Sequence, residues 1–163
     1  MSVTFNAFEI FEMAEQIERN GAKFYRTAAK AFKDAGIEKT LLELADMEVE
    51  HEKTFADMRK KLSEKQRGFM AFDPENQIAL YLQAMAGGRV FDIKKDPARQ
   101  LAGVDNVADI LKMAIDAEKD SIVFYTGLKN FVPPKAGTDR VEAIINEEMG
   151  HIVTLTQKLT ELT

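Results

Sequence analysis

Six side chains of the types that bind metal ions recur in this sequence at a fixed spacing. Two Glu-x-x-His pairs, Glu48 with His51 and Glu148 with His151, lie 100 residues apart, and a further glutamate stands 30 residues before each pair. The whole set is Glu18, Glu48, His51, Glu118, Glu148 and His151. Residues three apart on a helix are neighbours on one face, so each pair can present two ligands together.

The charge of this set indicates how many ions it would hold. The six residues interrupt otherwise apolar helical faces, where an unpaired carboxylate is costly and neighbouring carboxylates repel one another. The inward-facing positions offer one basic residue, Lys158, near the far end of its helix. Four carboxylates carry −4, two neutral imidazoles carry no charge, and two divalent cations supply +4. The sequence therefore predicts two metal ions, with iron favoured and manganese or zinc as substitutes.

Four helical segments are needed to bring these residues to one height. Along each of them apolar residues recur three and four positions apart, as expected for helices packed in a bundle. The predicted segments run from about Phe5 to Phe32, Ile37 to Leu62, Asn106 to Phe131 and Asp139 to Leu162.

Local signals mark the ends of these helices. Gly36 is expected to stop the first helix and Asp105 to cap the third. Two consecutive prolines break the third helix at its end. Asp139 and Glu142 have the spacing of a capping box at the start of the fourth.

The segment between the second and third helices, residues 63–104, contains several Gly and Pro turn signals. Within it, Glu75 to Ala86 is predicted to form one short helix. Two hairpins, 5–62 and 105–162, joined by one long crossover have the connectivity of ferritin-like bundles. We therefore expect an all-α, ferritin-like four-helix bundle of two antiparallel helical hairpins, formed by a single domain over residues 1–163.

Each half also carries a tyrosine in a matching place. Tyr25 and Tyr125 follow Glu18 and Glu118 by seven residues, which is two turns along the same helical face. The simplest interpretation is core packing with a hydroxyl that finds a partner. We favour a hydrogen bond from the hydroxyl to a metal-binding carboxylate, and a redox-active phenol is the third interpretation. The 100-residue repeat itself predicts two hairpins related by approximate two-fold symmetry.

Acidic residues next to the set have a simpler explanation. Glu50, Glu52 and Glu147 are expected to be surface acids. Because Glu147 stands beside Glu148, the register of the fourth helix is ambiguous, and the match of Glu148 to Glu48 decides it.

The composition excludes several other classes of protein. A net charge of −5, with no basic cluster beside aromatic residues, argues against nucleic-acid binding. Zero cysteines exclude disulfides, thiolate catalysis and cysteine-bound metal clusters in this sequence. The first residues, MSVTFNAFEIFE, lack a secretory signal pattern, and no apolar stretch approaches the length of a membrane span, so we expect a cytoplasmic protein without a membrane partner.

The sequence around the six residues resembles the ferritin-like di-iron carboxylate superfamily, and within it the rubrerythrin-related proteins. The resemblance is carried by ERNGAKFY, LADMEVEHEKTF, EKDSIVFY and NEEMGHIVTL. The roles that it implies are terminal carboxylates for Glu18 and Glu118, bridging carboxylates for Glu48 and Glu148, and terminal imidazoles for His51 and His151. Two departures weaken a peroxidase assignment: the four cysteines of a rubredoxin domain are absent, and Ser121 stands where rubrerythrins carry an extra carboxylate.

Three functions are consistent with this sequence. The first is a di-iron oxidoreductase that reduces H2O2 or O2 with electrons from an external donor. The second is a ferroxidase or iron-binding protein for storage or detoxification, and the third is a non-enzymatic metal-stabilised bundle. We expect a homo-oligomer, with a dimer favoured.

Overall fold

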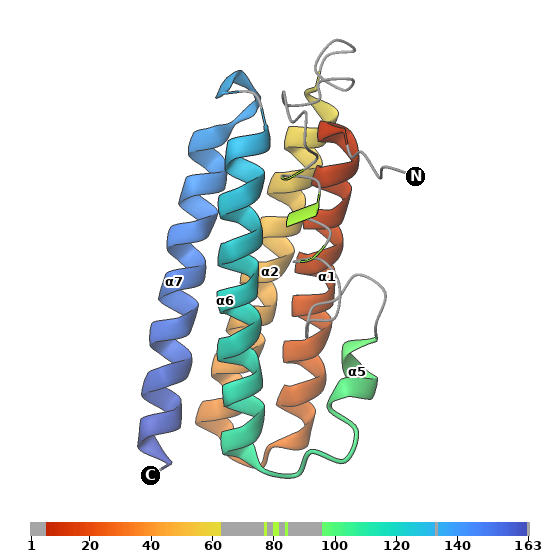
Figure 1. The fold of residues 1–163 in the computed structure, drawn as a ribbon. Coiled ribbons are helices and arrows are strands. Elements are labelled where there is room, and N and C mark those ends of the chain that lie inside the picture. Colours follow the sequence, from red (N-terminus) through yellow and green to blue (C-terminus); the bar gives the residue numbers. More distant parts are fainter. Residues whose placement is uncertain are drawn as a thin grey trace.

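The computed structural model describes residues 6–62, 77, 80, 81, 84, 96–132 and 134–162. Its elements are α1 (Ala7–Ala31), α2 (Ala35–Lys60), the short α5 (Pro97–Gln100), α6 (Val107–Phe131), a 3-10 turn (Pro134–Ala136) and α7 (Thr138–Glu161). The four long helices form the predicted all-α bundle (Figure 1).

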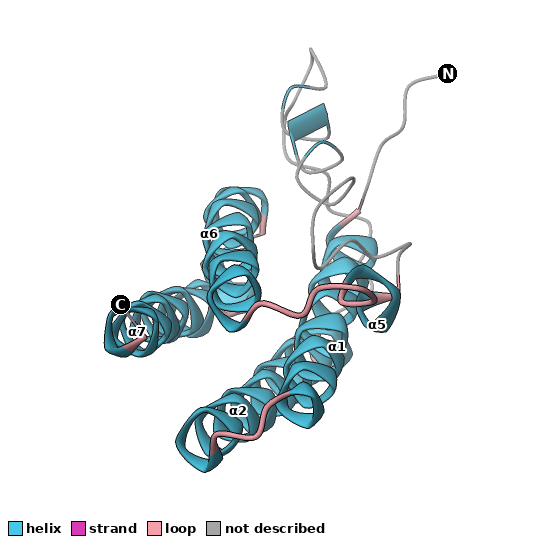
Figure 2. Ribbon diagram, turned by 90° about the horizontal axis from the view of Figure 1, so that it is seen from below, coloured by secondary structure: helices cyan, strands magenta, loops and turns pink. Residues whose placement is uncertain are grey.

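The bundle consists of two antiparallel hairpins. α1 packs along α2, and α6 packs along α7, while α1 also contacts α6 and α2 also contacts α7. Figure 2, which views the bundle along its axis, shows the two hairpins side by side. α2 ends at the opposite end of the bundle from the start of α6 (Figure 1), as the predicted long crossover requires.

Asn6 and Glu9 form a capping box at the start of α1, in which each side chain accepts a hydrogen bond from the backbone amide of the other.

The start of α2 differs from the prediction. Asp34 caps α2 by accepting from the amides of Gly36 and Ile37, both at 2.9 Å. Because this cap satisfies the free amides so early, Gly36 lies in the first turn of α2, and the prediction that it stops the preceding helix is wrong.

The N-terminal caps of both helices in the second hairpin also differ from the prediction. Asn106, not Asp105, caps α6, and its side chain accepts from two backbone amides of the first turn. α7 follows Gly137, whose φ of 109° is left-handed and suits glycine. This turn starts the helix without a side-chain cap, so the predicted capping box of Asp139 and Glu142 is absent.

Apolar residues from all four long helices form one continuous core. Phe55 of α2 links the hairpins, since its ring centroid lies 6.4 Å from that of Phe11 on α1 and 5.0 Å from that of Tyr125 on α6. Within the described ranges, no helix is long and apolar enough to cross a membrane.

The predicted crossover helix, Glu75 to Ala86, falls mostly outside the described residues. Gln77, Leu80, Tyr81 and Ala84 are described, and these four have helical conformation. Tyr81 donates a hydrogen bond of 2.6 Å to the carbonyl oxygen of Val123 on α6. This contact ties the described part of the crossover to the second hairpin.

Candidate metal centre

The structure brings all six predicted residues together inside the bundle. Each of them is at most 3% exposed. The contributing elements are α1 for Glu18, α2 for Glu48 and His51, α6 for Glu118, and α7 for Glu148 and His151. The three-residue spacing of each Glu-x-x-His pair turns both side chains toward the bundle axis, because residues three apart share a helical face.

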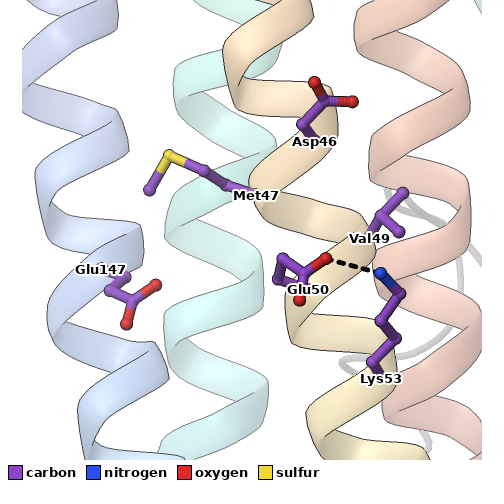
Figure 3. Close-up of a pocket in the computed structure, with 6 residues that line it drawn as sticks. All are labelled: Asp46, Met47, Val49, Glu50, Lys53 and Glu147. Atoms are coloured by element: carbon purple, nitrogen blue, oxygen red, sulfur yellow. Dashed lines mark hydrogen bonds and ion pairs between the residues drawn. The ribbon is translucent and has the colours of Figure 1, made fainter.

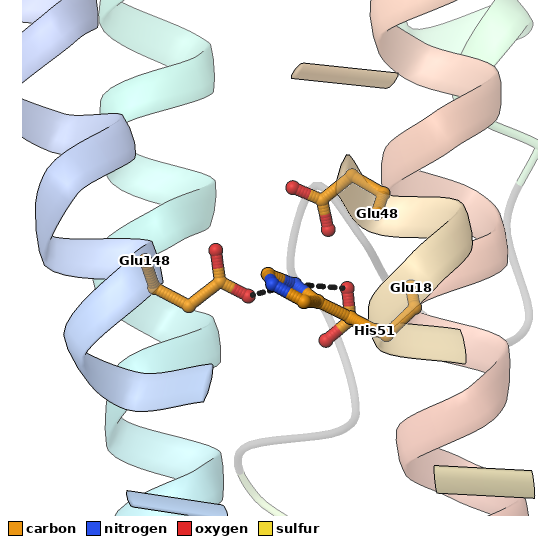
Figure 4. A group of neighbouring side chains, drawn as sticks. All are labelled: Glu18, Glu48, His51 and Glu148. Carbon is orange, nitrogen blue, oxygen red and sulfur yellow. Dashed lines mark ion pairs between the residues drawn. The ribbon is translucent and has the colours of Figure 1, made fainter. Parts of the chain in front are cut away.

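The six residues form two overlapping groups. The first group consists of Glu18, Glu48, His51 and Glu148, and the second of Glu48, Glu118, Glu148 and His151. Within each group, one oxygen or nitrogen atom from every member lies within 4.8 Å of the others. Figure 4 shows the first group, in which the four side chains converge and the imidazole lies between two carboxylates. Glu48 and Glu148 belong to both groups, so they occupy the middle of the cluster.

Both histidines turn the same ring nitrogen toward the carboxylates. His51 Nδ1 lies 3.5 Å from Glu18 Oε2 and 3.3 Å from Glu148 Oε1. His151 Nδ1 lies 2.8 Å from Glu148 Oε2 and 3.2 Å from Glu48 Oε1. The two rings stack with their centroids 5.6 Å apart. Each imidazole can therefore supply one inward-facing nitrogen ligand.

The chemistry of the cluster fits a pair of metal cations. Several of its buried polar atoms have no hydrogen-bond partner among the described residues. They are Glu18 Oε2, Glu48 Oε1, Glu118 Oε2, both side-chain oxygens of Glu148, Nδ1 of His51 and both ring nitrogens of His151. No lysine or arginine of the described ranges is buried with them. Since unpaired buried acceptors are costly, a cation that accepts their lone pairs is the group that such a donor set suits.

Burial and charge shift the pKa values within the cluster. Burial opposes protonation of His51, but close contacts with Glu148 and Glu18 outweigh it and raise its pKa to about 11. His151 responds in the same way to Glu118 and Glu148, with a pKa of about 10. Burial and the charge of Glu148 raise the pKa of Glu118 to about 8. For Glu148 burial favours protonation, yet the two imidazoles lower its pKa to about 2. Metal cations would compete with the protons on these ligands.

Two tyrosines bind carboxylates of the cluster. Tyr25 donates a hydrogen bond to Glu118, and Tyr125 donates one to Glu18. Both tyrosines are fully buried. Burial, and then the charge of the glutamate that each contacts, raises both pKa values well above the ordinary value, so both phenols stay protonated as donors. The structure thus contains the hydrogen bonds that the sequence favoured, and a redox role for either phenol stays a prediction.

Gly21 makes room for the cluster, a role that its sequence position does not reveal. It lies on α1 one turn after Glu18. A Cβ atom at this position would lie 3.1 Å from Glu48 Oε2 and 3.3 Å from Glu48 Cδ. Since α2 packs closely against α1 here, a side chain at residue 21 would compete with the carboxylate for the same space.

Glu147 was expected to be a surface acid, and the structure gives it a contact with the cluster. Its side chain is 51% exposed, yet Oε2 lies 2.8 Å from His51 Nε2. By contrast, Glu50 pairs with Lys53, 2.6 Å away, outside the cluster. Glu52 pairs with Arg19 at the same distance. Sequence reasoning missed Glu147 because its partner belongs to the other hairpin, so no local spacing links the two.

Comparison with known proteins agrees with this architecture. The sequence model of the family described as Rubrerythrin matches residues 9–159. Among solved structures, the chain is similar to a protein from Thermotoga maritima described as a ferritin-like diiron-carboxylate protein, with 27% sequence identity, a TM-score of 0.77 and 100% of each chain covered. A search of curated proteins gives no match. The predicted ferritin-like fold is thereby confirmed.

Proposed function

Since this chain belongs to the rubrerythrin family, we propose that its buried cluster binds two iron ions and that the protein reduces H2O2 or O2 with electrons from an external donor. The observation that carries this proposal is the pair of overlapping ligand groups that share Glu48 and Glu148. Two groups with two carboxylates in common suit two neighbouring ions that those carboxylates bridge, as in other bundles with Glu-x-x-His motifs.

Each ion would also have a glutamate and a histidine of its own. Glu18 and His51 would hold one ion, and Glu118 and His151 the other. Manganese or zinc would fit the same oxygen-rich donor set, although zinc has no redox chemistry. When bound, the two iron ions supply Lewis acidity and two electrons for reduction of the oxidant.

The protein orients the metal-binding carboxylates, excludes water from the cluster and keeps two tyrosines protonated beside it. Burial of all six ligands keeps bulk water away from the cluster. Tyr25 and Tyr125 hold the carboxylates of Glu118 and Glu18 in place and keep their own protons on the phenolic oxygens. Because these 163 residues contain no cysteine, they cannot hold an iron–sulfur centre, and the proposed source of the electrons is an external donor.

The test is oxidation of the ferrous protein by a measured amount of peroxide. The metal-free chain is loaded anaerobically with two Fe2+ per chain, and one equivalent of H2O2 is added while ferric absorbance is followed. Each H2O2 should take one electron from each of two Fe2+ and, with two protons, yield two waters. Glu48→Ala should abolish the fast phase, whereas Glu50→Ala, an exposed acid on the same helix, should leave it unchanged. Equal fast phases in wild type and Glu48→Ala would contradict the proposal.

A ferroxidase that serves iron storage is the second candidate, and one observation favours it. Ser121 is buried on α6, 4% exposed, at the position where rubrerythrins carry an extra carboxylate. In rubrerythrins the extra carboxylate is tied to peroxide chemistry. A site with six ligands and no extra carboxylate therefore fits a ferroxidase without specificity for H2O2. Repeated additions of Fe2+ and O2 distinguish the candidates, since storage requires uptake well beyond two ions per chain. Light scattering adds a second criterion, since the homodimer that we propose would disfavour a storage cage. A metal-stabilised bundle would show neither turnover nor iron uptake beyond two ions per chain.

A further inference from the structure

The two halves of the cluster differ in what contacts the outer nitrogen of the histidine. His51 Nε2 lies 2.8 Å from Glu147 Oε2. His151 Nε2 is buried and has no hydrogen-bond partner within the described part of the chain. The residue 100 positions before Glu147 is Met47, whose thioether sulfur is a weak acceptor. The internal repeat is therefore broken at a position that contacts the cluster.

Glu147 links the protein surface to the buried ring. Its side chain is 51% exposed, whereas that of His51 is 4% exposed. Figure 3 shows Glu147 and Met47 extending toward each other from α7 and α2. Both line a surface hollow of about 540 Å³, together with Asp46, Val49, Glu50 and Lys53. Because Glu147 belongs to the second hairpin and His51 to the first, the contact also joins the two hairpins.

The contact with Glu147 sets which ring nitrogen of His51 is free to bind a metal ion. A carboxylate oxygen accepts hydrogen bonds, so in the neutral imidazole the proton is placed on Nε2. Nδ1 then presents its lone pair to the cluster, where Glu18 and Glu148 lie 3.5 and 3.3 Å away. A hydrogen bond of this kind fixes the ring and makes the ligating nitrogen more basic, and loss of such a partner typically lowers metal affinity about 10- to 100-fold.

We propose that Glu147 is a positioning residue that makes the two metal sites unequal. The site of Glu18 and His51 takes the first divalent cation. The site of Glu118 and His151 takes the second cation about 10- to 100-fold more weakly, because no carboxylate of the described residues binds the outer nitrogen of its imidazole. This inference rests on the proposed function only in requiring that the cluster binds two cations.

Stepwise addition of Co2+ to the metal-free, full-length chain tests the inference, with heat and visible absorbance recorded together. Wild type should bind two ions in two resolved steps. Glu147→Ala should weaken the first step about 10- to 100-fold, so that the two steps merge. Glu147→Gln keeps an acceptor oxygen and should restore most of the first step. Glu50→Ala removes another acid from the same hollow, is matched in charge change, and should leave both steps as they are.

Two further comparisons assign each step to its half of the cluster. Met47→Glu supplies the missing carboxylate at the position related to Glu147, and it should strengthen the second step. Glu18→Ala and Glu118→Ala form a matched pair, since each removes one carboxylate that a buried tyrosine binds. The first variant should lose the stronger step and the second the weaker one.

The outcomes separate this inference from the proposed function. Two equal steps in wild type, or unchanged steps in Glu147→Ala, would overturn the inference while leaving a two-metal site intact. No uptake of Co2+ by wild type would contradict the proposed function itself. Thermal unfolding of each metal-free variant shows whether it folds, and if Glu147→Ala does not, Met47→Glu still decides the question, since an unchanged second step in that variant would contradict the inference.

Discussion

Tyr25 and Tyr125 exchange partners across the bundle: each donates its phenolic hydrogen to the glutamate that lies seven residues before the other. Glu18 is therefore held by the second hairpin and Glu118 by the first. All four groups are buried. Because a buried carboxylate that loses a donor is costly, this exchange stabilises the relative register of the two hairpins at the height of the cluster.

Replacing one of these phenols tests the contribution of the exchange. Tyr25→Phe should lower the free energy of unfolding of the metal-free protein by about 1–3 kcal/mol, because it leaves a buried oxygen of Glu118 without its donor. Tyr125→Phe should have a similar effect through Glu18. Urea unfolding measures both. Tyr81→Phe, which removes a hydroxyl bound to a backbone carbonyl away from the cluster, is the control and should cost less. Equal losses in all three variants would show that the carboxylate contacts have no special weight.

Gly21 offers a test of the space around Glu48. Gly21→Ala should weaken metal binding, because its Cβ would lie 3.1 Å from Glu48 Oε2 and displace that carboxylate. Gly150→Ala on α7 is the matched control, since a Cβ there meets no atom within 4 Å. The control should raise the free energy of unfolding by about 0.5–1 kcal/mol through helix propensity and leave metal binding unchanged. If Gly21→Ala binds metal as wild type does, the carboxylate has room that the structure does not show.

The stability of the metal-free protein should depend on pH with a defined sign. Contacts with carboxylates raise the pKa of His51 to about 11 and that of His151 to about 10 against the opposing effect of burial, and burial raises that of Glu118 to about 8. The folded chain thus binds more protons than the unfolded chain. The stabilisation from the two histidines is present below about pH 6.5 and is lost as the pH rises toward their folded pKa values, and that from Glu118 is present below about pH 4.5 and is lost as the pH rises toward about 8. Glu148, with its pKa lowered to about 2, acts oppositely and loses stabilisation below about pH 4.5.

Urea unfolding with a chelator present, at several pH values from about 5 to 10, measures this dependence. The free energy of unfolding should fall steadily across that range. Replacement of both histidines by glutamine should flatten the curve. A stability that rises with pH in wild type would show that the folded cluster releases these protons.

Metal loading should raise stability through the cluster alone. For each site, a free Fe2+ or Mn2+ concentration 100 times that site's dissociation constant should add about 2.7 kcal/mol to the free energy of unfolding, because the ions bind the folded chain. Removal with a chelator should reverse the gain. Glu48→Ala should lose the gain and Glu50→Ala should keep it, as thermal unfolding with and without metal will show. A gain that persists in Glu48→Ala would place the stabilising ions elsewhere.

Much of the candidate site follows from local spacing. The Glu-x-x-His pairs could be read from the sequence because residues three apart on any helix share a face. The 100-residue repeat then related one half to the other without any knowledge of how the hairpins pack. Helix ends were harder to predict: Gly36 is a common stop signal, but Asp34 supplies a competing cap just before it, and the choice depends on how the turn packs.

The sequence by itself determined that this protein has four amphipathic helices with two copies of one carboxylate and imidazole half-site, because helical period and residue type are local properties. The tertiary structure alone decided which residues of one hairpin meet the other. The exchange of Tyr25 and Tyr125, the close approach of Gly21 to Glu48 and the contact of Glu147 with His51 all depend on the rotation and axial offset of packed helices. Those quantities arise from the fit of many side chains at once, and no spacing within one helix contains them.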